Sequence, residues 1–279
     1  MTIAVTGATG QFGRLVVAAL RKKGEAPIAI ARDPARSADL GVETRKGDYD
    51  DPADWPAALA GVDTLLLVSG SEIGKRAAQH RTVIEAAVAA GVGRIVYTSL
   101  LRADSSAIGL APEHAETEAL IRASGIPFTI LRNGWYLENH ESAVGSAVEH
   151  GAVIGSAGEG RFASAARRDY ADAAVAALLA DDLDGRTVEL AGDASFTLGE
   201  LAAEISRQTG RTIPYVHMTE SDYAGALVEA GLPAPVAGAY AAFDTATAGG
   251  ALASSDRSLS RLIGRPTTAV KDFVSGLLG

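Results

Sequence analysis

The N-terminus of the chain combines a short strand, a glycine-rich turn and a helix. Residues 2–6 are apolar or β-branched, and the amphipathic segment 14–20 follows the turn. Only glycine lets the main chain turn this sharply and approach a phosphate closely, and a helix N-terminus balances the phosphate charge. Three spaced glycines are weak evidence, but a strand before them and a helix after them predict a dinucleotide site. Its expected residues are Gly7, Ala8, Thr9, Gly10, Gln11, Phe12 and Gly13. The alternative is a tight turn that binds nothing.

The residue after the second expected strand indicates which dinucleotide binds. This strand covers residues 27–31, and Arg32 follows it. Where NAD binds, an acidic residue at this place holds the ribose 2′-hydroxyl. An arginine suits a 2′-phosphate instead, because its planar fork is permanently charged. We therefore predict NADP(H) as the cofactor. Asp33 and Pro34 are expected to start a short helix, which puts Arg36 one turn further on, either at the same phosphate or on a solvated face.

Composition limits the class of protein and of partner. The 279 residues are 47% hydrophobic and 21% charged, which is typical of a globular protein. A net charge of −9 without a basic tract argues against nucleic acid as a partner. The chain has no cysteine, which excludes disulfides and thiolate metal sites and fits a reducing compartment. Met1 leads directly into a strand, which leaves no room for a signal peptide, and the apolar runs are too short for a bilayer. We expect a cytoplasmic protein with no membrane partner.

Strands and helices alternate through the first half of the chain. Apolar strands are expected at 64–69, 94–99 and 127–132, with helices at 76–90 and 112–123. Strands that are apolar throughout are typical of a parallel sheet covered on both faces. The predicted fold class is therefore α/β, a doubly wound parallel sheet.

The pattern changes after Asn133, where regular structure is expected to give way to irregular chain. Residues 151–160 are interpreted as a glycine-rich loop. A helix at 169–180, a strand at 187–190 and a helix that opens with a capping box at Thr197 are expected later. The Ala/Gly-rich stretch 234–253 fits either a lid or a packed helix.

No linker rich in Ser or Pro divides the two halves. We expect residues 1–135 to form the cofactor-binding domain, which also receives elements from about 165–192. Residues 136–279 are expected to form a smaller C-terminal α/β lobe that binds substrate and is not independent.

Polar and aromatic residues follow several of the expected strands. Ligands of open parallel sheets bind beyond the carboxyl ends of the strands. We therefore expect the third strand's loop to line the adenine, and the later ones to surround a flat ring. The residues concerned are Asp48, Tyr49, Ser69, Gly70, Ser71, Thr98, Asn133, Gly134, Trp135 and Tyr136. Alternative roles are helix capping for Ser69 and Ser71, and core packing for Trp135 and Tyr136.

The catalytic group is the least defined part of the site. None of the seven tyrosines has a lysine four residues later, so the usual acid of short-chain reductases is missing. G-x-S-x-G and H-E-x-x-H are also missing, and we expect no metal. His114 lies in an acidic helix start, where it could donate a proton or simply begin the helix. His114 and Tyr136 are the candidate catalytic residues.

Longer stretches resemble the NmrA-like atypical short-chain dehydrogenases, and within them the bacterial NADPH:quinone oxidoreductases. The shared stretches are residues 6–13 with Arg32, 97–101, 113–118, 132–139, 190–193 and 262–267. The resemblance implies an NADPH-dependent quinone reductase with a Rossmann-like domain and a smaller lobe. By motif match it also places residues 7–12, Arg32, 69–71 and 133–138 at the cofactor, which adds Leu137 and Glu138. Related plant reductases carry a lysine where His114 stands, so alcohol–ketone chemistry is in doubt.

Quinone reduction suits a site without a strong acid, because hydride transfer yields a stabilised anion that water can protonate. Trp135, Tyr136, Tyr240 and Phe243 are candidates for the wall of the quinone pocket. Two other functions stay open. One is a redox sensor that binds NADP(H) and regulates a partner without turnover, and the other is a reductase or epimerase of another small carbonyl compound. The sequence predicts no oligomeric state.

Overall fold

The computed structural model describes residues 1–180 and 182–279. These residues form two compact units. Unit 1 consists of Met1–Asp104, Leu110–Asn133 and Arg168–Glu189. Unit 2 consists of Ser105–Gly109, Gly134–Arg167 and Leu190–Gly279. The assignment of cofactor binding to the first part of the chain and of substrate binding to the second stays a prediction.

Unit 1 is built on a seven-stranded sheet of order β3-β2-β1-β4-β5-β6-β8. Its strands are β1 (Ile3–Val5), β2 (Ile28–Ala31), β3 (Thr44–Lys46), β4 (Thr64–Leu67), β5 (Arg94–Leu100), β6 (Phe128–Asn133) and β8 (Arg186–Leu190). The pairings from β3 across to β6 are parallel. The strand order reverses between β1 and β4, and ligands bind at such a switch point. The predicted doubly wound parallel sheet is confirmed.

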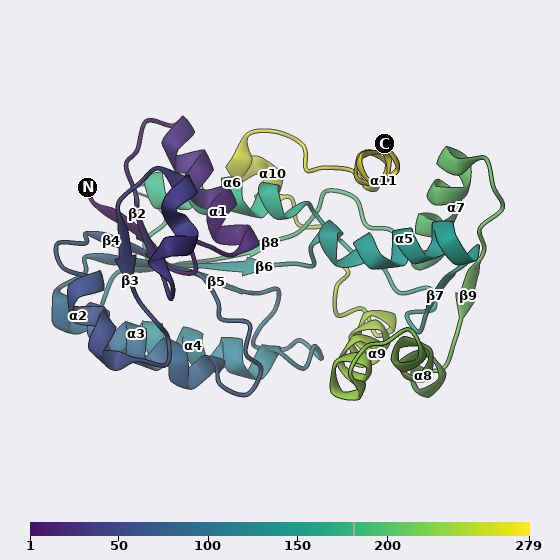
Figure 1. Ribbon diagram of the computed structural model, residues 1–279, viewed down its shortest axis with the longest axis horizontal. Helices are drawn as coiled ribbons and strands as arrows, with labels where there is room; N and C mark the ends of the chain where they lie inside the picture. The colour runs from purple at the N-terminus through teal and green to yellow at the C-terminus, as the bar shows by residue number, and fades with distance from the viewer. Residues whose placement is uncertain (181) are drawn as a thin grey trace. The chain divides into compact units, whose positions relative to one another are not determined.

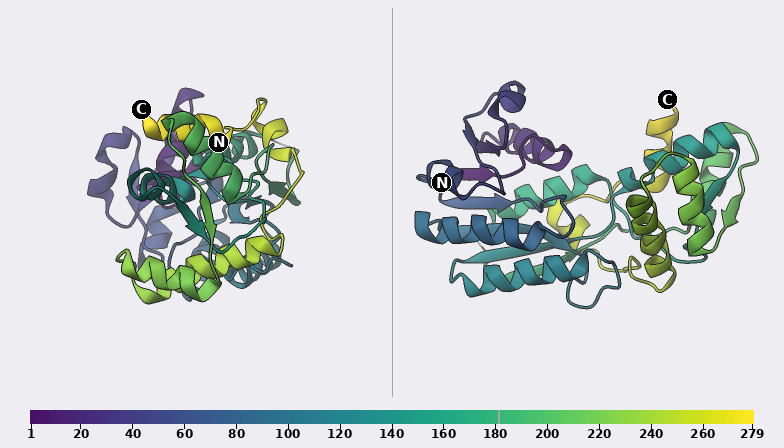
Figure 2. Two further views of the ribbon diagram at one scale, coloured as in Figure 1. Left: turned by 90° about the vertical axis from the view of Figure 1, so that its right-hand side faces the viewer. Right: turned by 60° about the horizontal axis from the view of Figure 1, so that its bottom comes forward.

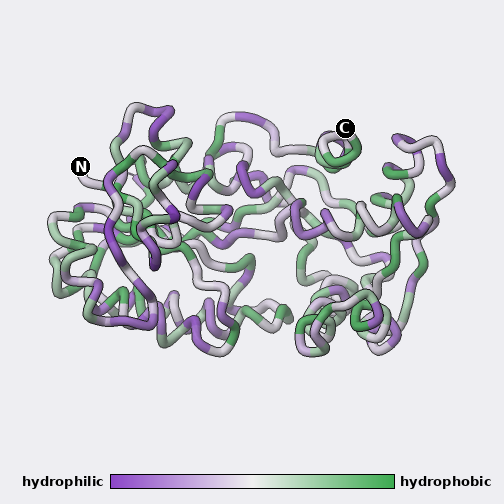
Figure 3. Tube along the Cα trace, in the orientation of Figure 1, coloured by the Kyte–Doolittle hydropathy of each residue, from purple (hydrophilic) through white to green (hydrophobic). Residues whose placement is uncertain are grey.

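Helices cover both faces of this sheet. They are α1 (Gln11–Lys22), α2 (Trp55–Ala58), α3 (Arg76–Ala90), α4 (Ala111–Ala123) and α6 (Arg167–Leu179), with the 3₁₀ helices η1 (Pro34–Leu40) and η2 (Pro52–Asp54). In Figure 1, α3 and α4 lie against one face, and α1 and α6 lie against the other. Figure 3 shows hydrophobic and hydrophilic residues interspersed along the chain. On α3 the side turned to the core includes Val83, Ile84 and Ala87, which are buried.

The core of unit 1 lies between the sheet and helices α2 to α4. Leu65, Leu67, Ile95 and Ile130 of the strands are fully buried there. Val83, Ala87 and Ile121 of the helices pack against them. Burying a side chain of this size contributes about 1.5–3 kcal/mol, so this layer holds the strand ends in place.

The predicted helix ends in unit 1 follow from recognisable local signals. Asp33 accepts a hydrogen bond from the backbone N–H of Ala35 (3.1 Å), with Pro34 in the first helical position. Helix α3 covers the predicted residues and ends at Gly91, whose φ of 70° is left-handed. Both predictions are confirmed.

Unit 2 is mainly helical around a two-stranded parallel sheet. Its strands are β7 (Val153–Gly155) and β9 (Tyr215–His217), and Val153 lies opposite Tyr215. Its helices are η3 (Leu137–His140), α5 (Glu141–His150), α7 (Leu198–Thr209), α8 (Glu220–Glu229), α9 (Ala234–Ala248), α10 (Ser258–Ile263) and α11 (Val270–Leu278). Figure 2 shows α8 and α9 side by side. The predicted capping box is confirmed, because Thr197 and Glu200 exchange side-chain to backbone hydrogen bonds of 3.1 and 2.9 Å.

The expectation of irregular chain after Asn133 is wrong. Residues 141–150 form α5, and three residues of the supposed loop 151–160 form β7. Local propensity hides α5, because glycine and serine interrupt it. Burial of Val144 and Ala147 stabilises this helix, and β7 depends on β9, about sixty residues later. Over residues 1–180 and 182–279, no helix is both long and apolar enough to cross a membrane.

Candidate functional site

The turn between β1 and α1 requires glycine at Gly7 and Gly13 and leaves little room for a side chain at Gly10. Gly7 has a φ of +57°, a conformation that residues with side chains adopt at a cost. A Cβ at Gly13 would overlap the carbonyl oxygen of Gly7, and one at Gly10 would lie 3.2 Å from that oxygen. Gly10 is also the N-cap of α1 and offers no side-chain acceptor to the first turn. The turn is therefore tight and directs a helix N-terminus at its ligand.

Arg14 connects this turn to η1, a role that the sequence did not indicate. Its Nε donates to the carbonyl oxygen of Thr9 (3.1 Å) and its Nη2 to that of Arg36 (2.7 Å). Its Nη1 pairs with Asp39 at 2.6 Å. The positions of the glycine turn and of the segment after Arg32 are thereby linked.

The guanidinium groups of Arg32 and Arg36 are exposed. Within residues 1–180 and 182–279 neither side chain makes a hydrogen bond or an ion pair. Both groups are therefore available to a phosphate. Arg32 directly follows β2, at the carboxyl edge of the sheet. Whether Arg36 shares the phosphate or faces solvent stays open.

The loop after β3 is held against β1 and β4. The Tyr49 hydroxyl lies 2.6 Å from Thr6 Oγ1 and 2.6 Å from the carbonyl oxygen of Val68. The Tyr49 ring stacks on Trp55, with 5.8 Å between centroids. Trp55 Nε1 donates to the carbonyl oxygen of Asp48 (2.9 Å). Hydrogen bonds and ring stacking thus hold the loop in place, and its contact with adenine stays a prediction.

The loop after β4 is anchored by buried side chains. The N–H of Ser69 donates to Thr98 Oγ1 (2.9 Å) and that of Gly70 to His80 Nε2 (3.0 Å). Arg76 Nε donates to the carbonyl oxygen of Gly70 (2.9 Å). Sequence reasoning missed His80 and Arg76, because nothing in the local pattern separates them from other helical residues. Helix α3 starts after Lys75 without a side-chain cap, so Ser69 and Ser71 do not cap it.

His114 lies in a buried polar cluster behind this loop. Its Nδ1 is 2.7 Å from the Tyr97 hydroxyl, and the side chain is 5% exposed. Burial, together with the positive charge of Arg76, lowers the pKa of His114 to about 3. Burial first, then His114 and Arg76, lower the pKa of His80 to about 3 as well. Both histidines are neutral at ordinary pH, and this environment argues against a charged His114 as the proton donor.

Strand β6 ends in an amide without a partner. Asn133 is 4% exposed, and neither its Nδ2 nor its Oδ1 has a hydrogen-bond partner among the described residues. Buried amides are almost always satisfied, so a ligand or water is required here. Gln79 Oε1 is also buried and unpaired, and lies 3.1 Å from the place of a Cβ on Gly70. The Asn133 amide has both the donor and the acceptor that a nicotinamide carboxamide would pair with, and the Gln79 oxygen can accept from a hydroxyl such as that of a ribose.

The residues after Asn133 have different environments. The Tyr136 ring packs under the Arg167 guanidinium, 5.1 Å from its centroid. Leu137 is fully buried, and both carboxylate oxygens of Glu138 accept the N–H of Arg167 (3.0 and 2.8 Å). These contacts give Leu137 and Glu138 structural roles within unit 2. Their contact with the cofactor, and that of Gly134, stays a prediction.

Trp135 lines a cavity of about 450 Å³ in unit 2. The Trp135 and Phe243 rings meet edge to face at 5.4 Å, and Phe243 and Tyr240 do so at 6.2 Å. Three of the four proposed pocket-wall residues thus line one cavity. Tyr136 is not among its described lining residues, which weakens it as a catalytic candidate. Sequence reasoning missed His140, Tyr223 and Asp244, which also line it, because they come from η3, α8 and α9.

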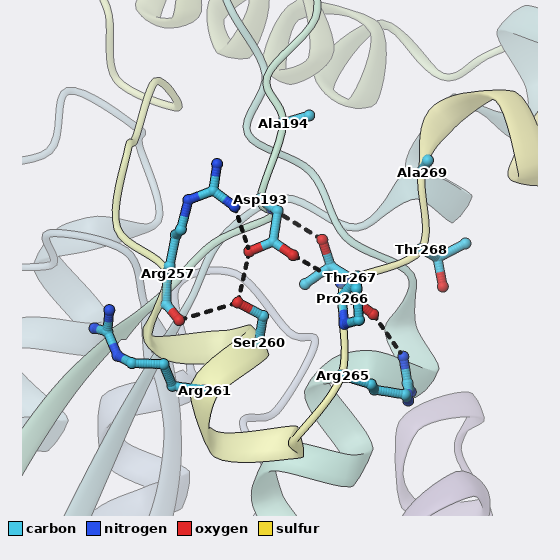
Figure 4. Close-up of a pocket in the computed structure, with 10 residues that line it drawn as sticks. All are labelled: Asp193, Ala194, Arg257, Ser260, Arg261, Arg265, Pro266, Thr267, Thr268 and Ala269. Carbon is cyan, nitrogen blue, oxygen red and sulfur yellow. Dashed lines mark hydrogen bonds and ion pairs between the residues drawn. The ribbon is translucent and has the colours of Figure 1, made fainter.

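Two of the motifs in the family resemblance, residues 190–193 and 262–267, meet at a second cavity of unit 2. Asp193 accepts hydrogen bonds from the Ser260 hydroxyl (2.6 Å) and the Thr267 N–H (2.9 Å). The N–H of Asp193 donates in turn to Thr267 Oγ1 (2.9 Å). Figure 4 shows Asp193 at the centre of these contacts. Residues 190–193 and 262–267 are therefore a structural connection between the chain after β8 and α10.

We expect Asp193→Ala to lower the free energy of unfolding by about 1–2 kcal/mol, because the two hydrogen bonds to its carboxylate are lost and partly buried donors are left unpaired. Urea unfolding followed by circular dichroism measures this. Arg257→Ala is the matched control. It removes only an exposed partner, 3.7 Å from Asp193, and should cost less than about 1 kcal/mol. Equal losses in both variants would contradict the structural role of Asp193.

The comparisons with known proteins agree with this geometry. A family model described as NAD(P)H-binding matches residues 7–181. The chain belongs to this family. Quinone oxidoreductase 2 of Escherichia coli (strain K12) is 48% identical over 280 residues, covering 99% of this chain and 98% of that protein. The E. coli NADPH-dependent quinone oxidoreductase QOR2, crystallised with NADPH, has a TM-score of 0.97 at 47% identity, with 100% of both chains covered.

Two further reductases or oxidoreductases are similar to this chain over nearly its whole length. Triphenylmethane reductase of Citrobacter sp., crystallised with NADP(H), has a TM-score of 0.95 at 36% identity, covering 99% of this chain and 100% of that one. An NmrA-like family domain-containing oxidoreductase of Aspergillus flavus is 27% identical over 298 residues, covering 100% of this chain and 95% of that protein. The predicted NmrA-like relationship and NADP(H) as the cofactor are confirmed. Among the described residues, no group of three or more His, Asp or Glu side chains is placed to hold a metal.

Proposed function

We propose that the protein reduces quinones with NADPH by direct hydride transfer from nicotinamide C4. The observation that carries this proposal is the 48% identity with E. coli quinone oxidoreductase 2 over nearly the whole of both chains. The partner is then a small-molecule quinone. A cytoplasmic location, where NADPH is kept reduced, is part of the same proposal.

The residues of this chain fit the cofactor. The glycine turn and the N-terminus of α1 would hold the pyrophosphate. The turn lets backbone N–H groups come close to the phosphates, and the positive end of the helix dipole favours their negative charge. Arg32 would hold the 2′-phosphate. The unpaired amide of Asn133 would meet the nicotinamide carboxamide. When bound, NADPH supplies the hydride.

The protein's part in the chemistry is to position the quinone and to exclude water. Trp135 follows Asn133 by two residues, and its cavity in unit 2 has the aromatic walls that suit a flat ring. A quinone that accepts hydride becomes a stabilised anion, which takes its proton from water. No strong acid is needed, which agrees with a neutral, buried His114.

Turnover and binding together test the function. NADPH oxidation should depend on added menadione and on enzyme, and calorimetry should detect NADPH binding. NADPH binding without quinone-dependent oxidation would favour the redox sensor instead. Oxidation with enones or aldehydes but not with quinones would favour reduction of another carbonyl compound.

The pH profile of quinone reduction should show no ionisation of His114. An unperturbed histidine loses its proton near about pH 6.5, whereas the lowered pKa of His114 keeps it neutral from well below that point upwards. We expect kcat/KM to have the same shape between about pH 5.5 and 8 in wild type and His114→Gln. A transition near about pH 6.5 that His114→Gln abolishes would contradict this.

A further inference from the structure

The cavity of about 450 Å³ in unit 2 presents the hydroxyl of a half-buried tyrosine. Tyr223 of α8 lines this cavity together with Trp135, Tyr240 and Phe243. Across residues 1–180 and 182–279, no hydrogen bond involves the Tyr223 hydroxyl, and its oxygen is not enclosed by protein. A molecule in the cavity can therefore reach a donor that is free within the described part of the chain.

The Tyr223 hydroxyl stays protonated at ordinary pH. Burial raises its pKa well above the ordinary value, and the negative charge of Asp244 raises the pKa further. The hydroxyl is therefore a neutral hydrogen-bond donor and not a source of protons.

The cavity offers little positive charge to a bound molecule. Its described lining contains no lysine or arginine. Burial lowers the pKa of His140 to about 4 and leaves this histidine neutral, and the His150 side chain is 69% exposed beside Glu149. The Asp244 carboxylate, which accepts the N–H of Ser156 at 2.9 Å, opposes a second negative charge. A negative charge that develops in the cavity therefore depends on neutral donors for its stabilisation.

Quinone reduction creates such a charge. The C–H bond at nicotinamide C4 breaks, and its hydrogen moves to the quinone with both electrons. NADPH becomes NADP⁺, and the quinone becomes a hydroquinone anion with its charge on oxygen. Water then supplies the proton that completes the hydroquinone. A donor fixed beside that oxygen stabilises the charge more strongly in a cavity than in bulk water, because the effective dielectric constant is lower.

We propose that the Tyr223 hydroxyl donates a hydrogen bond to a carbonyl oxygen of the bound quinone and stabilises the negative charge that this oxygen gains. The proposal rests on the proposed function, which supplies the quinone and the hydride. Tyr223 keeps its own proton throughout the reaction. Tyr240 is the other hydroxyl of the aromatic wall, but its side chain is 40% exposed, so water competes for it.

Tyr223→Phe tests the hydrogen bond, because it keeps the ring and removes only the oxygen. With saturating NADPH, kcat for menadione should fall about tenfold or more and KM should change less than about threefold, because the bond strengthens as the oxygen becomes charged. The NADPH dissociation constant, measured by calorimetry, should stay within about twofold. The midpoint of thermal unfolding should shift by less than about 1 °C, because no hydrogen bond within the described residues is lost.

Tyr215→Phe is the matched control. The Tyr215 hydroxyl donates to the carbonyl oxygen of Gly155 and accepts the N–H of Gly158, both at 3.1 Å. This variant should lower the midpoint of thermal unfolding by about 2–4 °C and leave kcat within about twofold. Tyr240→Phe should lower kcat less than Tyr223→Phe does, because the Tyr240 side chain is more exposed.

The outcomes separate this proposal from the proposed function. If wild type reduces menadione and Tyr223→Phe keeps its kcat, the proposal fails and the quinone function stands. A raised KM with an unchanged kcat would show that Tyr223 only shapes the cavity, and a clear fall in the unfolding midpoint would show that its hydroxyl serves the fold. Either result overturns the proposal. If wild type binds NADPH and does not reduce menadione, the quinone function fails and the proposal fails with it.

Discussion

Arg32→Asp is expected to abolish the preference for NADPH over NADH. The exposed guanidinium of Arg32 after β2 has no partner within the described residues. Its charge and all of its N–H donors are therefore available to a 2′-phosphate. The variant loses a charge-assisted contact with the 2′-phosphate and gains a repulsive carboxylate. The ratio of kcat/KM for NADPH to kcat/KM for NADH should therefore fall on the order of 100-fold. Steady-state kinetics with both cofactors and one quinone measure this ratio.

Two further variants separate local recognition from overall charge. Lys22→Asp changes the net charge by the same amount at the far end of α1, and should leave the cofactor ratio within about twofold. Arg36→Ala decides between the two roles of Arg36. A loss of about tenfold in NADPH preference places it at the phosphate, and no change places it on a solvated face. An unchanged preference in Arg32→Asp would refute the assignment of Arg32.

Glu118→Ala is expected to cause the largest loss of stability. Glu118 is 1% exposed and receives both Nε and Nη2 of Arg132, each at 2.8 Å. It also accepts the Ser99 hydroxyl at 2.6 Å. Removing one partner leaves a buried guanidinium with Asp104 and Glu189 alone. We expect the free energy of unfolding to fall by about 3 kcal/mol, as measured by urea unfolding.

Glu116→Ala is the matched control on the same helix. Its carboxylate is 55% exposed and lies 3.4 Å from Arg81, so the loss should stay below about 1 kcal/mol. Similar losses at both positions would show that the buried network does not stabilise unit 1.

The stabilisation by Glu118 should also depend on pH. Burial alone would raise the pKa of Glu118, but hydrogen bonds from Arg132 and Ser99 hold it below its usual 4.5. A carboxyl with a lowered pKa stabilises the fold above its unfolded pKa, and this contribution is lost as the pH falls through the folded pKa. The difference between wild type and Glu118→Ala should therefore shrink in acid.

Much of unit 1 was predictable because its signals are local. An apolar run such as that of β4 reports a strand buried on both faces, and a cap such as Asp33 or a stop such as Gly91 marks a helix end within a few residues. The glycine turn and Arg32 are equally local, since each depends on its place beside one strand.

Unit 2 was less predictable because its elements depend on distant partners. Helix α5 has no strong helical signal, and β7 is three residues long and pairs with β9. The cavity contains Trp135 and Asp244, which lie more than a hundred positions apart in the chain. The periodicity and spacing of residues in the sequence do not indicate which distant residues line the same cavity.

By itself, the sequence determined the order of strands and helices, the glycine turn and the choice of NADP(H). These depend on interactions between near neighbours and on the chemistry of single side chains. Only the tertiary structure decided that His114 is buried and neutral, that Asn133 lacks a partner, and that Asp244 lies beside aromatic rings. Burial and charge pairing arise from segments that meet only when the chain has folded, because desolvation depends on everything that surrounds a group.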